Sequence, residues 1–497
     1  MSLVQSARRS RVAMVGTAGA LALAGSVVVA LPAAAAPAGC ETRDNNTVDK
    51  LLECTTVDGV LEHLTAFQEI AEAHGGNRAS GTAGYDASVD YVEQRLEAAG
   101  YDVTRQEFDF DFFELTGQTF SRTAPEARDY VADTDFAALE YSGVGTASGA
   151  VVPVDLGDPL APTDTSTSGC EAEDFAGFPE GGVALVQRGT CTFAVKVANA
   201  ETAGAVGVVV VNRGTPENEG LVAGTLGEPG VLPAIGVPFA IGQELAAGGT
   251  EVTFTVDAET GTRTTENVVA ELPGRTDEVV QVGAHLDSVP EGPGINDNGT
   301  GSAAVLELAE NVQKVEPQAT LRFSWWGAEE SGLLGSTHYV EQLPEEEVAR
   351  ISAYLNFDMV GSPNPVRFVY DSDGEDFEST PAGYVSERSA QIEDTFEKFY
   401  ADRGLANENT EFDGRSDYQA FADAGVPSGG LFTGAEGVKT EEQAAVYGGV
   451  AGEAYDPCYH QACDDLDNLD LGVLDENADA IAYAASVLAA GGPGAGN

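Results

Sequence analysis

Positive charge is scarce in this sequence. Its 497 residues include 24 lysines and arginines against 81 aspartates and glutamates, which gives a formal net charge of −57 at pH 7. A chain this acidic repels nucleic-acid phosphates and anionic membrane surfaces, so we expect neither as a partner. The acids are scattered and 43% of the residues are hydrophobic, which excludes a disordered acidic tail.

Long apolar runs are absent after residue 31, so no later segment is expected to span a membrane. Before that point, three arginines (Arg8, Arg9 and Arg11) precede an apolar stretch at 12–31, and alanines follow at 33–36. This pattern is typical of a cleaved export signal over 1–36, and it predicts a secreted protein with no stable membrane association after cleavage.

Alternatives remain for this N-terminus. An uncleaved membrane anchor is one, because the stretch approaches the ~20 residues that a bilayer requires, although Pro32 and the small residues favour cleavage. The Arg8-Arg9 pair leaves open twin-arginine export. Residues 37–40 resemble a lipidation box only faintly, because Pro37 stands where an aliphatic residue is expected.

Cysteine is also sparse, with six residues in the whole chain. An even number in an exported protein favours disulfides, and six cysteines allow fifteen pairings. We expect the pairing that closes the shortest loops: Cys40 with Cys54, Cys170 with Cys191, and Cys458 with Cys463. Free thiols or a metal site are the alternatives, but the spacings do not match a zinc ribbon or knuckle.

Three zones follow one another along the chain, and its length also suggests about three domains. The zone at about 41–130 has helical periodicity, with Gly75-Gly76 between two helices and Gly100 as a C-cap. From about 131 to 258, short β-rich runs at 183–187 and 206–211 flank a helix-like segment at 193–203. From about 264, predicted strands at 267–272, 278–283, 321–326 and 354–357 alternate with helices at 300–315 and 333–342. This alternation predicts an open, largely parallel sheet covered by helices.

Histidines and carboxylates follow the predicted strands, at the rim where such sheets bind ligands. The chain has only five histidines; His63, His74 and His338 lie at helical positions and are expected to be structural. The other two belong to a set that follows strands or sits in loops: His285, Asp297, Glu329, Glu330, Asp358 and His460. Two imidazoles with several carboxylates suit two divalent ions that share a carboxylate, with a spare carboxylate as general base. Asp287 can orient the His285 ring from behind.

Seven motifs carry a family resemblance: GAHLDS, GPGINDNGTGSAAVLE, WWGAEESGLLGS, YLNFDMVGSPNP, DGRSDYQAF, GGLFTGA and PCYHQACD. Together they resemble the secreted bacterial dizinc aminopeptidases, whose family also holds vacuolar aminopeptidase Y and, more distantly, the transferrin receptor. The resemblance covers about 60–120 and 264–490. The middle zone resembles the protease-associated domain that is often inserted in this family.

The resemblance implies a fold and a division of the chain. The fold class is α/β, with a mixed, mostly parallel sheet flanked by helices, of the zinc-exopeptidase type, and an inserted small β-rich α/β protease-associated domain. The expected division is a signal peptide at 1–36, the peptidase domain at 37–130 and 261–497, and the insert at 131–260.

The resemblance also implies residue roles around two zinc ions. His285 and Asp358 resemble the ligands of the first zinc, Glu330 and His460 those of the second, and Asp297 the bridging aspartate. Glu329 resembles the general base, Tyr459 the residue that steadies the oxyanion, and Arg415 and Phe432 residues that shape the substrate cleft. In family members the Cys458–Cys463 pair is a disulfide. Some relatives bind calcium through C-terminal aspartates that Asp475 and Asp479 resemble, but the N-terminal partner is not evident here.

The expected function is removal of N-terminal residues, with a preference for large apolar ones, from peptides by a monomeric enzyme. A carboxypeptidase or glutaminyl-cyclase-like relative is the alternative, and carboxypeptidase action would need a cation such as Arg415 for the substrate carboxylate. Receptor-type relatives lose ligands, whereas all five ligand positions are filled here.

Overall fold

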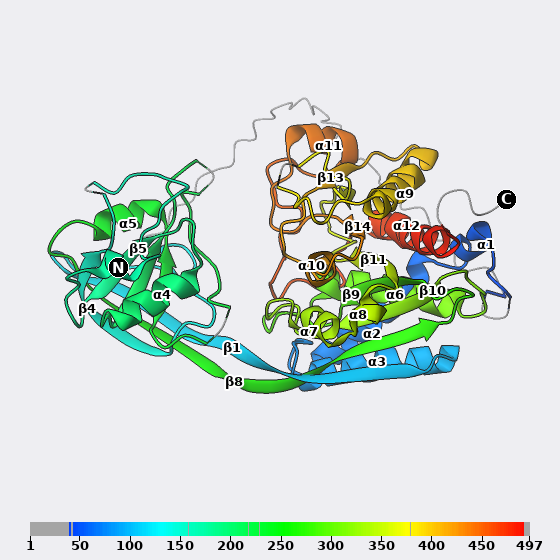
Figure 1. The fold of residues 1–497 in the computed structure, drawn as a ribbon, viewed down its shortest axis with the longest axis horizontal. Helices are drawn as coiled ribbons and strands as arrows, with labels where there is room; N and C mark the ends of the chain where they lie inside the picture. Colours follow the sequence, from blue (N-terminus) through cyan, green and yellow to red (C-terminus); the bar gives the residue numbers. More distant parts are fainter. Residues whose placement is uncertain are drawn as a thin grey trace, which may run out of the picture.

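Two 22-residue strands, β1 (Val103–Ala124) and β8 (Glu251–Leu272), pair antiparallel and connect two lobes (Figure 1). We call residues 125–250, between these strands, the insert lobe and the rest the main lobe. The computed structural model describes residues 39–40, 43–157, 159–216, 218–227, 229–377 and 379–491. The predicted signal at 1–36 lies outside them. Within these ranges, no helix combines the length and apolarity needed to cross a membrane.

The main lobe is built on a mixed sheet in the order β13-β12-β14-β11-β9-β10-β8. Its centre is parallel, because β9 pairs in parallel with both β10 and β11, and β11 pairs in parallel with β14. Near the edges, β8 runs antiparallel to β10 and β12 antiparallel to β14. The predicted α/β class with a mostly parallel sheet is therefore confirmed.

Helices cover both faces of this sheet, which explains why its central strands are buried along their length and rich in apolar residues. One face packs against α2, α3, α6, α9 and α12, and the opposite face against α7 and α10. The bounds of these helices are α2 Val57–Ala73, α3 Ala83–Ala99, α6 Gly301–Val312, α7 Leu334–Gln342, α9 Glu387–Arg403, α10 Tyr418–Asp423 and α12 Leu471–Ala489. The predicted end of α3 is also confirmed, because Gly100 caps it in the left-handed conformation at φ 99°.

Strands β9, β10 and β11 of the main lobe match the runs predicted at 278–283, 321–326 and 354–357, whereas no run was predicted for β12, β13 or β14. Their bounds are β9 Val279–His285, β10 Thr320–Trp326, β11 Ile351–Phe357, β12 Phe368–Tyr370, β13 Glu408–Thr410 and β14 Ser428–Phe432. The run predicted at 267–272 is only the end of β8, which continues into the insert lobe.

The insert lobe continues the same sheet through β4-β5-β6-β7-β3. Strands β4 to β7 are parallel to one another, and hydrophobic clusters lie on both faces of the sheet. The lobe contains β2 Arg128–Asp129, β3 Ala137–Ala138, β4 Gly145–Pro153, β5 Val183–Gln187, β6 Gly207–Val211, β7 Ala234–Val237, α4 Phe193–Thr202, α5 Phe239–Leu245 and the short helix Ala172–Phe175. Short helices elsewhere are α1 Val48–Leu52, α8 Glu345–Val348 and α11 Glu441–Tyr447.

Three disulfides join the cysteines in the pairing that is nearest in sequence, as predicted. Cys40–Cys54 holds the segment before α2, and Cys170–Cys191 lies in the insert lobe. Cys458–Cys463 closes a short loop in the main lobe, and that loop carries Tyr459 and His460.

Candidate metal centre

The carboxyl ends of three neighbouring parallel strands deliver most of the predicted ligands to one place. His285 is the last residue of β9, Glu329 and Glu330 follow the end of β10, and Asp358 directly follows β11. Because β10, β9 and β11 are adjacent in the sheet, these side chains meet at the same rim.

Asp297 stands between the two histidines. It lies in the turn at Ile295–Thr300, just before α6, and its two carboxylate oxygens face different imidazoles. Its Oδ1 is 3.3 Å from His285 Nε2, and its Oδ2 is 3.2 Å from His460 Nε2. The remaining carboxylates divide in the same way, with Asp358 Oδ1 3.2 Å from His285 Nε2 and Glu330 Oε2 3.1 Å from His460 Nε2. Glu329 Oε2 is farther, 3.9 Å from His285 Nε2.

This donor set fits two divalent cations. Four carboxylates converge with only two imidazoles, so two doubly charged ions would balance the negative charge of the centre. The groups His285–Asp297–Glu330 and His285–Glu329–Asp358 each place their ligand atoms within 4.8 Å of one another. Glu330 Oε1 is also buried without a hydrogen-bond partner, as expected of an oxygen that can bind a cation.

The protonation of these groups reflects their crowding. Burial lowers the pKa of His285, but the carboxylates of Asp358 and Glu329 outweigh it and hold the pKa well above its ordinary value. Burial would likewise lower the pKa of His460, but the carboxylates of Glu330 and Asp297 outweigh it and raise this pKa to about 12. Burial raises the pKa of Glu329 well above its usual range and that of Glu330 to about 7. Positive charge is therefore strongly favoured at this centre.

The loops around the centre adopt an uncommon backbone conformation. Ala328, Met359 and His460 all have positive φ, at 54°, 50° and 56°. Ala328 directly precedes Glu329, Met359 directly follows Asp358, and His460 is itself a candidate ligand. Such conformations are sparsely populated by non-glycine residues and tend to cluster at functional sites.

A hydrogen-bond chain orients Asp358 from behind, and sequence reasoning missed it. The Ser416 hydroxyl donates to Asp358 Oδ2 (2.6 Å), and the Asn356 amide donates to Ser416 Oγ (2.7 Å). Tyr354 OH donates to Asn356 Oδ1 (3.1 Å), and Trp326 Nε1 donates to Tyr354 OH (2.8 Å). Such outer hydrogen bonds fix the orientation of metal ligands.

Two further buried residues that sequence reasoning missed hold the Asp297 turn. The Arg78 guanidinium, with no exposed surface, donates to the carbonyl oxygens of Leu286, Pro293 and Gly294. The Asp464 carboxylate accepts from the backbone N–H groups of Asn296 (2.8 Å) and Asp297 (3.0 Å). Asp464 lies next to Cys463, so it ties the His460 loop to the Asp297 turn. The only sign of this link in the sequence is that both segments belong to recognised motifs, which contain GINDNG and PCYHQACD.

Asp287 lies beside the His285 ring as predicted, but it contacts the ring through its backbone carbonyl rather than through its carboxylate. Its carbonyl oxygen is 3.1 Å from His285 Nδ1, whereas its carboxylate Oδ1 is 3.7 Å away. Its Oδ1 instead accepts from the backbone N–H of Glu329 (3.2 Å). Asp287 therefore joins the β9 and β10 ends of the centre.

The predicted cleft residues line a cavity of about 240 Å³ beside the centre. Arg415, Phe432 and Tyr459 all contribute to its wall, together with Met359 and Tyr370. Arg415 donates to Glu436 Oε1 (2.8 Å) and to the Tyr459 hydroxyl oxygen (3.1 Å), and the Tyr459 ring stacks on His460. The structure thus brings these residues together, whereas Asp475 and Asp479 lie apart on α12.

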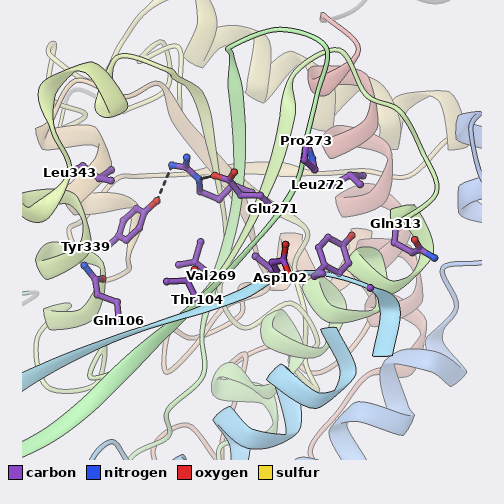
Figure 2. A pocket seen from close by; sticks show the side chains of 14 residues that line it. Asp102, Thr104, Gln106, Val269, Glu271, Leu272, Pro273, Gln313, Tyr339 and Leu343 are labelled. Carbon is purple, nitrogen blue, oxygen red and sulfur yellow. Dashed lines mark hydrogen bonds and ion pairs between the residues drawn. The ribbon is translucent and has the colours of Figure 1, made fainter. Parts of the chain in front are cut away.

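A second cavity, of about 600 Å³, lies where β8 and β10 approach Tyr101 and Tyr339 (Figure 2). Two of its charged residues pair with each other, since Arg322 donates to Glu271 (2.6 Å), and Arg322 also donates to the Tyr339 hydroxyl (2.9 Å). No histidine or cysteine is among the described residues that line it. Its chemistry therefore differs from that of the candidate metal centre.

Comparisons with known proteins identify the family. An "Aminopeptidase" of Pseudomonas aeruginosa is 49% identical over 445 residues, which cover 88% of this chain and 82% of that protein. The sequence model of Peptidase family M28 matches residues 267–485, and that of the PA domain matches 148–245. This chain belongs to peptidase family M28.

Other similar proteins extend this picture. A "Probable lipoprotein aminopeptidase LpqL" of Mycobacterium tuberculosis is 43% identical (88% of this chain, 86% of that protein), and a "Leucine aminopeptidase 2" of Arthroderma otae is 40% identical (88% and 85%). Among solved structures, an aminopeptidase from Aneurinibacillus sp. strain AM-1 has a TM-score of 0.68 and 27% identity (88% and 95%). A zinc aminopeptidase from Bacillus subtilis has a TM-score of 0.58 and 26% identity (86% and 93%). The predicted family and the PA insertion in this M28 peptidase are confirmed.

Proposed function

We propose that this M28 peptidase is an aminopeptidase that works with two zinc ions. His285 and Asp358 would hold one ion, Glu330 and His460 the other, and Asp297 both. One observation carries the proposal: the two oxygens of Asp297 face different imidazoles at 3.3 and 3.2 Å, as a bridging carboxylate requires. The names of the relatives from Pseudomonas, Arthroderma and Bacillus support both the activity and the metal.

Bound zinc supplies positive charge that polarises a peptide carbonyl and makes a water molecule more acidic. Glu329 Oε2 is the proton carrier: it accepts a proton from the attacking water and returns it to the leaving amine. Its distance of 3.9 Å from His285 Nε2, longer than those of the other carboxylates, leaves it free for this role.

Tyr459 is placed to stabilise negative charge on the substrate carbonyl oxygen. Arg415 donates to the Tyr459 hydroxyl oxygen, so the Tyr459 proton remains available for donation toward the substrate. A donor aimed at the charge that develops in the transition state is worth about 10²–10³ in rate.

Carboxylate oxygens in the wall of the cavity select a free α-amine at the end of the substrate. Glu329 and Asp358 line the cavity, and the Asp413 and Glu436 carboxylates add to its acidic wall. Arg415, the cation that a carboxypeptidase would need, is already paired with Glu436. The geometry therefore favours an amino-terminal over a carboxy-terminal substrate end.

The side chain of the first substrate residue would enter the cavity near Phe432. Met359, Phe432 and Tyr370 form an apolar part of its wall, which supports a preference for large apolar residues such as leucine. The name of the Arthroderma relative points to the same residue.

The test of this function is hydrolysis of leucine p-nitroanilide by the purified zinc-loaded protein. The free-amine substrate should be cleaved, and its N-acetylated counterpart should be cleaved at least about a hundredfold more slowly. Equal rates on both substrates, or cleavage of only the acylated one, would exclude the aminopeptidase assignment.

A calcium site near the start of α2 is a separate proposal. Asp475 and Asp479 lie one turn apart on α12, and Asp475 Oδ1 accepts from the Val57 backbone N–H (3.3 Å). Burial, with Asp475 as a second cause, raises the pKa of Asp479 to about 7, which a bound cation would reverse. A rise in melting temperature on adding calcium to the zinc enzyme, absent in Asp475→Asn, would support it; equal melting temperatures would refute it.

Export, oligomeric state and the domain boundaries are also proposals. Three disulfides support an oxidising compartment, and we propose a secreted monomer. Because the Mycobacterium relative is named a lipoprotein, the mass of the mature N-terminus should be measured for a lipid. Light scattering tests the monomer, and limited proteolysis tests the boundaries at 131 and 260.

A further inference from the structure

The insert lobe contacts the main lobe next to the candidate general base. The hydroxyl of Tyr141, in the insert lobe, donates to the carbonyl oxygens of Asp111 (2.9 Å) and Ser331 (3.3 Å). Ser331 directly follows Glu330, and 190 residues separate it from Tyr141 along the sequence. The contact therefore joins the insert lobe to the loop that carries Glu329 and Glu330.

That loop, which we call the base loop and define as residues 327–333, follows β10 and folds back as a tight turn. The Glu329 carbonyl accepts a hydrogen bond from the N–H of Gly332 (2.8 Å). Gly332 has a positive φ of 105°, a conformation that glycine adopts readily. Glu330 and Ser331 therefore form the tip of this turn.

The main lobe holds the start of the base loop at three consecutive backbone N–H groups. The acceptors are Asn267 Oδ1 for Gly327 (3.1 Å), Ser80 Oγ for Ala328 (2.6 Å) and Asp287 Oδ1 for Glu329 (3.2 Å). The Tyr141 hydroxyl holds the tip of the loop from the other lobe. The two lobes thus fix the base loop on both sides of Glu330.

Tyr141 is itself firmly held within the insert lobe. Its ring belongs to a hydrophobic cluster of that lobe, and only 7% of the residue is exposed. Its carbonyl accepts from the Gly230 N–H (2.7 Å). The residue before it donates its N–H to the Gly224 carbonyl (2.9 Å) and accepts from the Leu226 N–H (3.0 Å). The Tyr141 hydroxyl is therefore a donor in a fixed position.

The base loop has room to move if this donor is lost. A cavity of about 330 Å³ lies between the lobes, with Tyr141 and Pro229 on the insert side and Leu334 and His338 on the main-lobe side. Leu334 directly follows the base loop. Because side chains do not fill this space, packing does not substitute for the hydrogen bond.

We propose that Tyr141 is a positioning residue through which the insert lobe holds the tip of the base loop, so that Glu330 is aimed at its zinc ion and Glu329 at the attacking water. This inference rests on the proposed function. Hydrogen bonds from behind the ligands fix the orientation of groups around a metal ion, and here one such bond comes from the inserted domain. The insert lobe thereby takes a direct part in assembling the metal centre.

Tyr141→Phe tests this role, because it keeps the buried ring and removes only the hydroxyl. It should weaken zinc binding at the site of Glu330 and His460 and lower kcat for leucine p-nitroanilide, each by about three- to tenfold, the effect of one hydrogen bond. KM should stay the same, because Tyr141 is not among the described residues that line the substrate cavity. Competition with a chelator measures the zinc affinity, and kinetics at saturating zinc measure kcat and KM.

Tyr130→Phe is the matched control. Tyr130 is also a tyrosine of the insert lobe that is 7% exposed, and its hydroxyl donates to Glu244 within that lobe (3.2 Å). Removing this hydroxyl should leave both zinc affinity and kcat unchanged. If Tyr141→Phe and Tyr130→Phe have the same zinc affinity and the same kcat, Tyr141 does not position the base loop.

Hydrogen exchange separates positioning from a general loss of stability. In the zinc-loaded protein, residues 327–333 should exchange faster in Tyr141→Phe than in the wild type, whereas β5 and β6 of the insert lobe should exchange at the wild-type rate. Unchanged exchange at 327–333, or a uniform increase across the insert lobe, would overturn the positioning role. Failure of the wild type to cleave the anilide would overturn the proposed function alone, because zinc affinity and exchange are measured without substrate.

Discussion

The Ser416 hydroxyl donates a 2.6 Å hydrogen bond to Asp358 Oδ2, while Oδ1 of the same carboxylate lies 3.2 Å from His285 Nε2. One oxygen of Asp358 is thus fixed by the protein and the other is presented to the metal centre. Through Asn356, the bond also links the centre to the buried aromatic residues on the opposite side of the sheet from α6.

Ser416→Ala should weaken zinc binding, because Asp358 loses the donor that sets its orientation. Loss of such an outer partner typically costs about 10–100-fold in metal affinity. Competition with a chelator measures the affinity of each site. Ser352→Ala is the matched control, since its hydroxyl donates to the Val279 carbonyl (3.1 Å) on the neighbouring strand. Equal zinc affinity in Ser416→Ala and Ser352→Ala would contradict this role.

Asp297→Asn and His460→Ala should differ in how many ions they lose. Asparagine offers one neutral oxygen in place of two charged ones, so Asp297→Asn should bind neither ion tightly. His460→Ala should lose the ion that it shares with Glu330 and keep the other. Elemental analysis after dialysis counts the zinc ions per chain. Two ions retained in Asp297→Asn would show that Asp297 does not bridge.

The Cys458–Cys463 disulfide should support the zinc ion beside His460. It closes the loop that carries Tyr459 and His460, and its loss frees that loop. Replacing both cysteines with serine should lower zinc affinity at that site by about tenfold or more. The same change at Cys170 and Cys191, in the insert lobe, should leave zinc affinity unaltered. If the two double variants bind zinc equally, the loop does not need its disulfide.

The side chains of Glu307 and His63 are buried between α6 and α2. Their shifted pKa values should make the free energy of unfolding depend on pH in opposite directions. Burial raises the pKa of Glu307 from 4.5 to about 7, so its contribution is complete below pH 4.5 and declines as pH rises to 7. Burial, then Arg95, lowers the pKa of His63 from 6.5 to about 3, so its contribution is complete above pH 6.5 and declines as pH falls to 3. Between pH 4.5 and 6.5, the pH dependence of the Glu307 contribution to the free energy of unfolding therefore cancels that of the His63 contribution.

Glu307→Gln should remove the loss of stability that ionisation of Glu307 causes as pH rises, and it should leave the His63 contribution in place. Relative to the wild type, its free energy of unfolding should rise by about 3 kcal/mol between pH 4.5 and 7.5, at about 1.4 kcal/mol for each pH unit of the shift. Urea unfolding at both pH values measures the change, with the exposed Glu69→Gln on α2 as control. A difference from the wild type that is independent of pH would mean that Glu307 is not protonated in the folded protein.

The sequence predicted the centre of the main lobe well, because its strands are buried on both faces. Runs such as 279–285 and 320–326 are buried at every position and rich in apolar residues, and they contrast with the helices that follow. Strand β1 and most of β8 were missed, although alternating apolar residues mark parts of both, as at Phe108 and Phe110 in β1 and at Val252 and Phe254 in β8. Between such stretches both strands carry exposed threonine, glutamate and aspartate, and their 22-residue length depends on their pairing with each other.

The supporting residues of the site were missed because their roles depend on distant contacts. Arg78 lies after α2 in sequence, and only the fold brings it to the carbonyls of the 286–294 loop. Asp464 and Ser416 were inside recognised motifs, but nothing in one sequence indicates which backbone or carboxylate they contact. Motif spacing predicts the ligands, whereas their supports emerge from tertiary packing.

The most direct test of the account is Glu329→Ala, measured for zinc content and for hydrolysis of leucine p-nitroanilide together. The account predicts two zinc ions per chain and a kcat lowered by about 10²–10⁴-fold, because the proton carrier is lost while the ligands remain. Near wild-type turnover would show that Glu329 is not the base. Loss of a zinc ion would show that it is a ligand, and either result would contradict the proposed division of roles.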